Sequence, residues 1–205
     1  MRSAARYFWI PALALWIALL ATGWHQLLRH EFTAGSRSSE ADDWPVDTAL
    51  TRDPAWPTLI FFAHRNCPCT RASLNELEAI LSRAGVRPRV WIVLVSPKEG
   101  NDDRVGSGIE ERARTLPDAR LVLDFEGVEA RRFGARTSGH VYLYGRAGEL
   151  AFSGGITDAR GHEGPSLGRR AVLRRLQDET RERTVLPVYG CPIYLGDEDE
   201  QTRER

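Results

Sequence analysis

The sequence is poor in cysteine, with three residues in 205. Three cysteines are too few for the disulfide framework of a small secreted scaffold, and a single bridge would leave one thiol over. The chain also has no excess of charge of either sign, because 28 Lys and Arg balance 28 Asp and Glu. A formal net charge of zero argues against nucleic-acid binding through a broadly basic surface. We therefore expect no nucleic-acid partner.

Several catalytic signatures are absent as well. The sequence shows no Ser/His/Asp triad pattern, no paired-carboxylate signature, no Walker motif and no internal repeat. The glycine-rich stretch 154–164 contains no lysine, so we interpret it as a surface loop bordering the active site rather than a phosphate site. The acidic run 197–200 is typical of a solvated tail.

The N-terminal segment lacks charge from Tyr7 to Leu28, a stretch of 22 residues. That length is close to the roughly 20 residues that span a bilayer. We predict a membrane anchor over residues 1–28, with the following chain exported to the periplasmic side. The small residues Ala21-Thr22-Gly23 leave a cleaved signal peptide as an alternative, and a buried core helix is a third possibility.

The remaining chain divides into a polar linker over 29–54, a domain over 55–183 and a tail over 184–205. Apolar runs predict strands, and helical periodicity predicts the segments between them. The expected strands are 59–64, 89–96, 120–124, 141–144 and 150–152, and the expected helices are 68–84, 109–116, 128–133 and 167–183. This alternation, followed by a hairpin and a last helix, predicts an α/β fold with a mixed sheet.

The motif Cys67-Pro68-Cys69 lies between the first strand of this domain and the helix that follows it. A helix N-terminus carries partial positive charge, which favours a thiolate. Pro68 suits the first helical position, so we place Cys67 at the cap and predict that it is the attacking thiol. A bridge between Cys67 and Cys69 would be strained and labile, a poor structural link but a plausible catalytic one.

Cys191 and His64 are further candidates for the site. Cys191 could resolve a mixed disulfide, could be the third ligand of a metal site, or could be an unreactive tail residue. His64 lies three residues before Cys67, where an imidazole could help to deprotonate a thiol or bind a metal. For each of these residues a purely structural role stays open.

The order of elements over residues 55–183 resembles the thioredoxin-like superfamily. The local match is Phe61-Phe-Ala-His-Arg-Asn-Cys-Pro-Cys-Thr70, which is similar to the strand, Cys-x-Pro-Cys motif and helix of that superfamily. The resemblance implies a three-layer α/β/α fold with a mixed sheet. With the N-terminal anchor, the Asn-Cys-Pro-Cys-Thr motif also resembles the bacterial RedB-type group. Two positions depart from the superfamily pattern. Asn66 aligns with its attacking cysteine, and Gly139 stands at or near its cis-proline.

The resemblance implies thiol–disulfide exchange with exported protein thiols or disulfides, without a cofactor. It also suggests an alternative, because the family's cis-proline helps to keep metal away from the dithiol. With Gly139 in its place, Cys67 and Cys69 could bind copper or zinc together with His64 or His140. If His140 lies beside the sulfurs, the metal interpretation gains; if Cys191 lies there, the redox interpretation gains.

Overall fold

The computed structural model describes the chain except for residues 1–4, 37–42, 66, 97–106, 178–181 and 195–205. The chain forms two compact units, residues 1–33 and residues 34–205. The first unit contains helix α1, Ala5–Phe32. Its segment Trp9–Phe32 is long and apolar enough to cross a membrane, with a mean hydropathy of 1.3. The predicted apolar helix is therefore present, and it continues four residues beyond Leu28.

The second unit holds the remaining elements. Its strands are β1 (Thr58–His64), β2 (Arg89–Ser96), β3 (Ala119–Phe125), β4 (His140–Tyr144), β5 (Leu150–Gly155) and β6 (Thr184–Val185). Its helices are α2 (Thr70–Leu81), α3 (Ser107–Arg114), α4 (Val128–Phe133) and α5 (Leu167–Leu176). The acidic run 197–200 and most of the connection between the predicted strand 89–96 and the predicted helix 109–116 lie outside the described residues.

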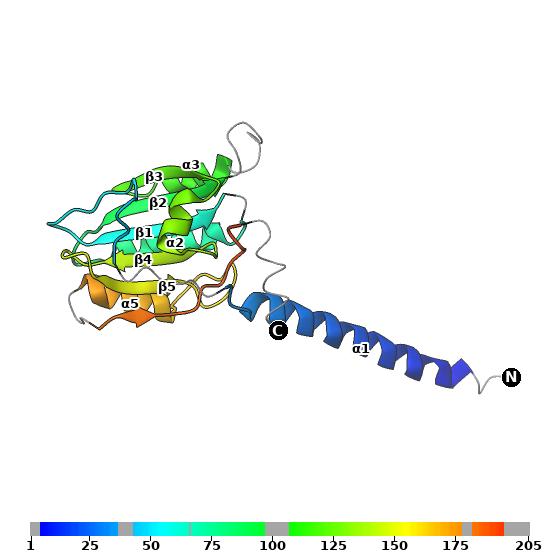
Figure 1. The fold of residues 1–205 in the computed structure, drawn as a ribbon. Helices are drawn as coiled ribbons and strands as arrows, with labels where there is room; N and C mark the ends of the chain where they lie inside the picture. Colours follow the sequence, from blue (N-terminus) through cyan, green and yellow to red (C-terminus); the bar gives the residue numbers. More distant parts are fainter. Residues whose placement is uncertain (1–4, 37–42, 66, 97–106, 178–181, 195–205) are drawn as a thin grey trace. The chain divides into compact units, whose positions relative to one another are not determined.

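The strands form one mixed sheet in the order β3-β2-β1-β4-β5-β6 (Figure 1). Strands β1, β2 and β3 are parallel, whereas β4 runs antiparallel to both β1 and β5. β1 is central, and its side chains are buried on both faces from Thr58 to Ala63, as its unbroken apolar run predicts. The carboxyl end of β1 therefore lies in the middle of the sheet, at the end where the parallel strands β1, β2 and β3 finish.

Helices cover both faces of the sheet. One core combines β1 side chains such as Phe61 with Leu77 of α2, Ala113 of α3 and Val172 of α5. The other combines alternate β1 residues such as Phe62 with side chains of α4. Residues that alternate along a strand point to opposite faces, so α4 lies on the face opposite α2, α3 and α5. The predicted three-layer α/β/α arrangement with a mixed sheet is confirmed.

Residues on both sides of 55–183 add to the packing. The Trp44 ring packs edge-on against Phe133 and Tyr144, at centroid distances of 5.3 and 5.1 Å. Val46, two residues later, is 95% exposed, so only part of the 44–46 segment docks on the domain. Ile193 of the tail is buried in the α4-side core.

Two predicted helices differ from the structure. Helix α2 begins at Thr70 with Cys69 as its N-cap, so the placement of Pro68 at the first helical position and of Cys67 at the cap was wrong. The reason is a turn before the helix, in which the Thr70 N–H donates to the Cys67 carbonyl at 3.1 Å. Helix α5 ends at Leu176 rather than Arg183.

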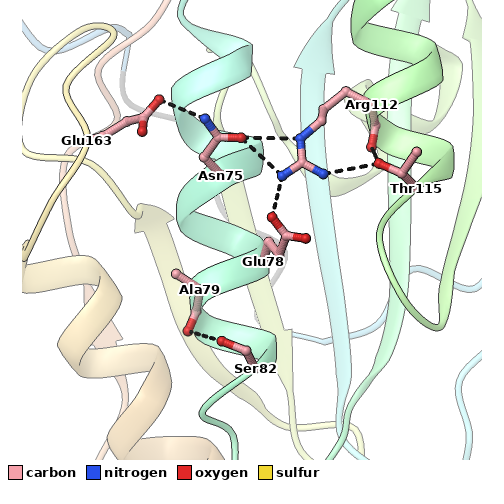
Figure 2. A network of polar contacts seen from close by, with 7 residues as sticks. All are labelled: Asn75, Glu78, Ala79, Ser82, Arg112, Thr115 and Glu163. Carbon is pink, nitrogen blue, oxygen red and sulfur yellow. Dashed lines mark hydrogen bonds and ion pairs between the residues drawn. The ribbon is translucent and has the colours of Figure 1, made fainter.

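Polar contacts hold α2 against its neighbours (Figure 2). The Arg112 guanidinium of α3 donates to Asn75 Oδ1 at 3.1 and 3.2 Å and pairs with Glu78. The Asn75 amide donates in turn to Glu163 Oε1 at 2.8 Å. One exposed edge of α2 thus joins α3 to the glycine-rich loop before α5.

Candidate active site

Cys67 lies in the turn between the carboxyl end of β1 and the start of α2. Its N–H donates to the His64 carbonyl at 3.1 Å, and the side chain is 1% exposed. Cys69 is partly exposed at the helix cap. The two sulfurs of the motif therefore occupy different environments, one buried and one at the surface.

The third cysteine, Cys191, lies against Cys67. Their sulfur atoms are 3.2 Å apart, and all three cysteines are present as thiols. Backbone contacts bring this distant segment to the site: β6 runs parallel to β5, and Gly155 N–H donates to the Pro187 carbonyl at 3.1 Å. Of the roles left open for Cys191, this position fits that of a resolving thiol.

The environment of Cys67 favours its thiolate. The hydrogen bond from the Cys191 thiol lowers the pKa of Cys67 to about 4, against the burial that raises it. The Cys191 N–H, the Ser138 hydroxyl and the Cys69 N–H lower it further. A thiolate that is stabilised in this way is the expected nucleophile, which agrees with the choice of Cys67 from the sequence, although the main cause is a thiol rather than the helix cap.

The other two thiols stay protonated. The hydrogen bond to Cys67 raises the pKa of Cys191, and burial adds to the effect. Burial raises the pKa of Cys69, as does the negative charge of Cys67. The three sulfurs thus form one anion with protonated neighbours, an arrangement in which a single thiolate attacks first.

The two histidines of the sequence analysis lie in different places. His64, at the end of β1, is close enough to Cys67 for its charge to raise the histidine pKa, but burial has the larger effect and lowers it. His140 is buried, with Nε2 at 2.8 Å from Ser153 Oγ and its ring stacked on Tyr142. Burial lowers the pKa of His140 to about 3, so its imidazole is neutral.

The segment that precedes β4 faces the cysteines from the neighbouring strand. Ser138 Oγ accepts from the His64 N–H at 2.9 Å and lies 3.1 Å from Thr70 Oγ1. Gly139 has φ +95° and donates its N–H to the Phe62 carbonyl at 2.8 Å. No cis peptide bond occurs among the described residues. A left-handed glycine therefore stands where the resemblance places a cis-proline.

Ser138 and Arg160 were not among the predicted site residues. The Arg160 charge lowers the pKa of both Cys69 and Cys191, against larger effects that raise them. The next residue, Gly161, lies so close that a Cβ there would be 3.9 Å from Cys69 Sγ. The glycine-rich loop thus borders the site as predicted, but no motif marks Arg160, whereas Ser138 could have been found from its place beside Gly139.

The structure brings together the three cysteines, while His140 makes its contacts elsewhere. Within the described part of the chain, no group of three or more His, Cys, Asp or Glu side chains is arranged to hold a metal. The sequence analysis asked whether His140 or Cys191 lies beside the sulfurs of the motif. Cys191 lies beside Cys67, which favours the redox interpretation.

Comparison with solved structures identifies chains that are similar to this one. An uncharacterised conserved protein from Geobacillus kaustophilus matches with a TM-score of 0.55 and 19% identity, over 80% of this chain and 93% of the other. An exposed lipoprotein thioredoxin from Streptococcus pneumoniae matches with a TM-score of 0.42 and 18% identity, over 60% and 84%. No protein-family model and no curated protein matches this chain.

Proposed function

We propose that the chain carries out thiol–disulfide exchange, as the resemblance to the thioredoxin-like superfamily implies, with Cys67 as the attacking thiolate and Cys191 as the resolving thiol. The observation that carries the proposal is the 3.2 Å contact between the two sulfur atoms. It supplies both the stabilised anion and a second thiol within reach of it. The membership of a RedB-type group stays a prediction.

The exchange takes place in two steps that conserve atoms and electrons. The Cys67 thiolate attacks a disulfide of the partner, a bond forms between Cys67 and one partner sulfur, and the other leaves as a thiolate. That thiolate takes the proton of Cys191. The Cys191 thiolate then attacks Cys67 Sγ, the Cys67–Cys191 bond forms, and the second partner sulfur leaves as a thiolate, which takes a proton from solvent.

The roles of the other residues follow from their contacts. The thiol of Cys191 stabilises the Cys67 anion before attack and becomes the second nucleophile afterwards. Cys69 is an alternative resolving thiol by sequence, but the sulfur that lies 3.2 Å from Cys67 Sγ is that of Cys191. His64, with its pKa lowered by burial, acts as a neutral neighbour rather than a cation.

Three substitutions test the assignment in the full chain, held in detergent micelles. We expect Cys67→Ser to abolish exchange with a small disulfide, and Cys69→Ser to retain it. We expect Cys191→Ser to react once and to stop at a mixed disulfide that persists. Unchanged exchange by the Cys67→Ser chain, or a persistent mixed disulfide only in the Cys69→Ser chain, would contradict the roles given to these residues.

We also propose that the domain is exported and held at the membrane by α1, where its partners are exported protein thiols or disulfides. The support is the apolar segment Trp9–Phe32, because a helix of that length can span a bilayer. In fractionated cells the full chain should stay with the membrane after alkaline washing, and protease added to spheroplasts should digest the domain. Protection of the domain from that protease would contradict the proposed side.

The copper or zinc alternative, with Cys67, Cys69 and either His64 or His140, finds less support. His140 lies beside Ser153 and Tyr142, and protein-bound copper(I) or zinc prefers several soft ligands in one place. Purification of the chain with a bound metal that acid removes would revive this alternative.

A further inference from the structure

The segment that carries Cys191 does more than deliver a thiol, because it pairs with the backbone beside the site like an added strand. The Ser138 N–H donates to the Cys191 carbonyl at 2.8 Å, and the Ile193 N–H donates to the Arg136 carbonyl at 2.8 Å. Between them, Thr137 and Pro192 form an antiparallel bridge. The backbone of residues 136–138 is therefore an edge that accepts an extended peptide, here supplied by the chain itself.

Two side chains of the same segment, those of Ile193 and Tyr194, make specific contacts with the domain. Ile193 is 4% exposed and joins the buried core on the α4 side of the sheet. Tyr194 donates its hydroxyl to the Ala135 carbonyl at 3.1 Å, and its ring lies under the Arg131 guanidinium at 4.9 Å. When a peptide adds to a sheet edge, main-chain bonds provide affinity and such side-chain sites provide specificity.

A close backbone contact fixes the register of the segment. A Cβ at Gly190 would lie 1.9 Å from the Ser138 carbonyl oxygen, so only glycine fits there without a shift of the backbone. This contact places the following residue, Cys191, with its sulfur at Cys67. The backbone pairing of the tail with residues 136–138 thus places the Cys191 sulfur beside that of Cys67.

We propose that Gly190–Tyr194 is an internal occupant of a docking edge formed by residues 136–138, and that a partner presents the same pattern to it. The partner is an extended protein segment with a cysteine, a large apolar residue two positions later and an aromatic residue three positions later. It takes the place of the tail, so that its sulfur meets Cys67, and the tail returns afterwards to bring Cys191 to the mixed disulfide. This inference rests on the proposed function, since docking matters only if Cys67 reacts.

The test uses full chains in detergent micelles and two synthetic peptides. One has the sequence Val-Tyr-Gly-Cys-Pro-Ile-Tyr of residues 188–194, and the other has Asp in place of Ile and Ser in place of the last Tyr. Each cysteine is activated as a mixed disulfide with thionitrobenzoate, whose release gives the rate of attack. Thionitrobenzoate release from a small disulfide is measured in parallel. A small disulfide has no peptide segment to pair with the docking edge, so this rate reports the intrinsic reactivity of Cys67.

The chains compared are the wild type, Gly190→Ala and Gly85→Ala. The Gly190→Ala substitution drives the tail away from Ser138, whereas a Cβ at Gly85 would meet its neighbours at an ordinary 3.7 Å. Displacement of the tail also removes the Cys191 hydrogen bond that lowers the pKa of Cys67, so each peptide rate is divided by the same chain's rate with the small disulfide. By this ratio we expect the Gly190→Ala chain to favour the first peptide about tenfold more than the wild type does, and to prefer it over the second peptide by about tenfold. The Gly85→Ala chain should behave as the wild type.

Two outcomes would overturn the proposal and are separable. Equal rates with both peptides in the Gly190→Ala chain, with attack on the small disulfide retained in the wild type, would reject the docking edge and leave the proposed function standing. Absence of attack on the small disulfide by the wild type would reject both. If the Gly190→Ala chain fails to fold, Ile193→Ser opens the same edge, and the preference between the peptides decides in the same way.

Discussion

At the scale of single residues, the main control over Cys67 is the thiol of Cys191. The pKa of Cys67 falls to about 4 chiefly through the hydrogen bond from that thiol. A group whose pKa lies far below neutral is ionised over the whole working range, so the rate of attack by Cys67 should be flat near neutral pH and fall only as the pH approaches that value. The residue that we propose as the resolving thiol therefore also sets the pKa of the proposed attacking residue.

Replacing Cys191 by alanine should raise the pKa of Cys67, because the largest effect that lowers it is removed while burial still raises it. The ultraviolet absorbance of the thiolate, titrated in the full chain, would show the midpoint moving to higher pH. Cys69→Ala is the matched control. The substitution keeps the Cys69 N–H that lowers the Cys67 pKa but removes a thiol that also hydrogen-bonds to Cys67, so the midpoint should rise less than in Cys191→Ala. An unchanged midpoint in Cys191→Ala would remove the physical basis for the assignment.

At the scale of elements, a buried ion pair joins α2, α5 and the loop beside Cys69. Glu76 Oε2 lies 2.7 Å from Arg169 Nη1, and Glu76 Oε1 accepts from the Gly164 N–H at 2.7 Å. Glu76 is buried, and the Arg169 side chain is only 12% exposed. Breaking such a pair leaves an uncompensated charge inside the protein, which is far costlier than the loss of a surface pair.

Glu76→Ala should lower the free energy of unfolding by about 3 kcal/mol. Glu78→Ala, on the same helix, should lower it by at most about 1 kcal/mol, because the Glu78–Arg112 pair is partly exposed to solvent. Denaturant titration of both variants measures the difference. Equal losses would mean that the loop beside Cys69 is not held by the buried pair.

Much of this element structure is predictable from the sequence, and the exceptions have local causes. The buried strands β1 and β2 are unbroken apolar runs, and α4 lies where the pattern placed it. The start of α2 was missed because a hydrogen-bonded turn comes before it, and Pro68 fits that turn as well as a first helical turn. Hydrophobic periodicity indicates which face of a helix is buried, but it does not determine the hydrogen bonds at either end of the helix.

At the scale of the whole molecule, the site depends on contacts that local sequence patterns do not encode. Cys67 and Cys191 are 124 positions apart, and the turn between β1 and α2 says nothing about where the tail lies. The tail reaches the site because β6 pairs with β5 and because Ser138 binds the Cys191 carbonyl. The dithiol motif and the fold could therefore be predicted, whereas the pairing of the sulfurs needed the tertiary structure.

The most direct test of the account is a disulfide map of the oxidised full chain. Mild oxidation in detergent micelles, followed by alkylation of free thiols, digestion and mass spectrometry, identifies which cysteines are joined. The account predicts one bridge between Cys67 and Cys191, with Cys69 alkylated and the mass of the intact chain lowered by two hydrogen atoms. A bridge between Cys67 and Cys69, with Cys191 alkylated, would contradict it.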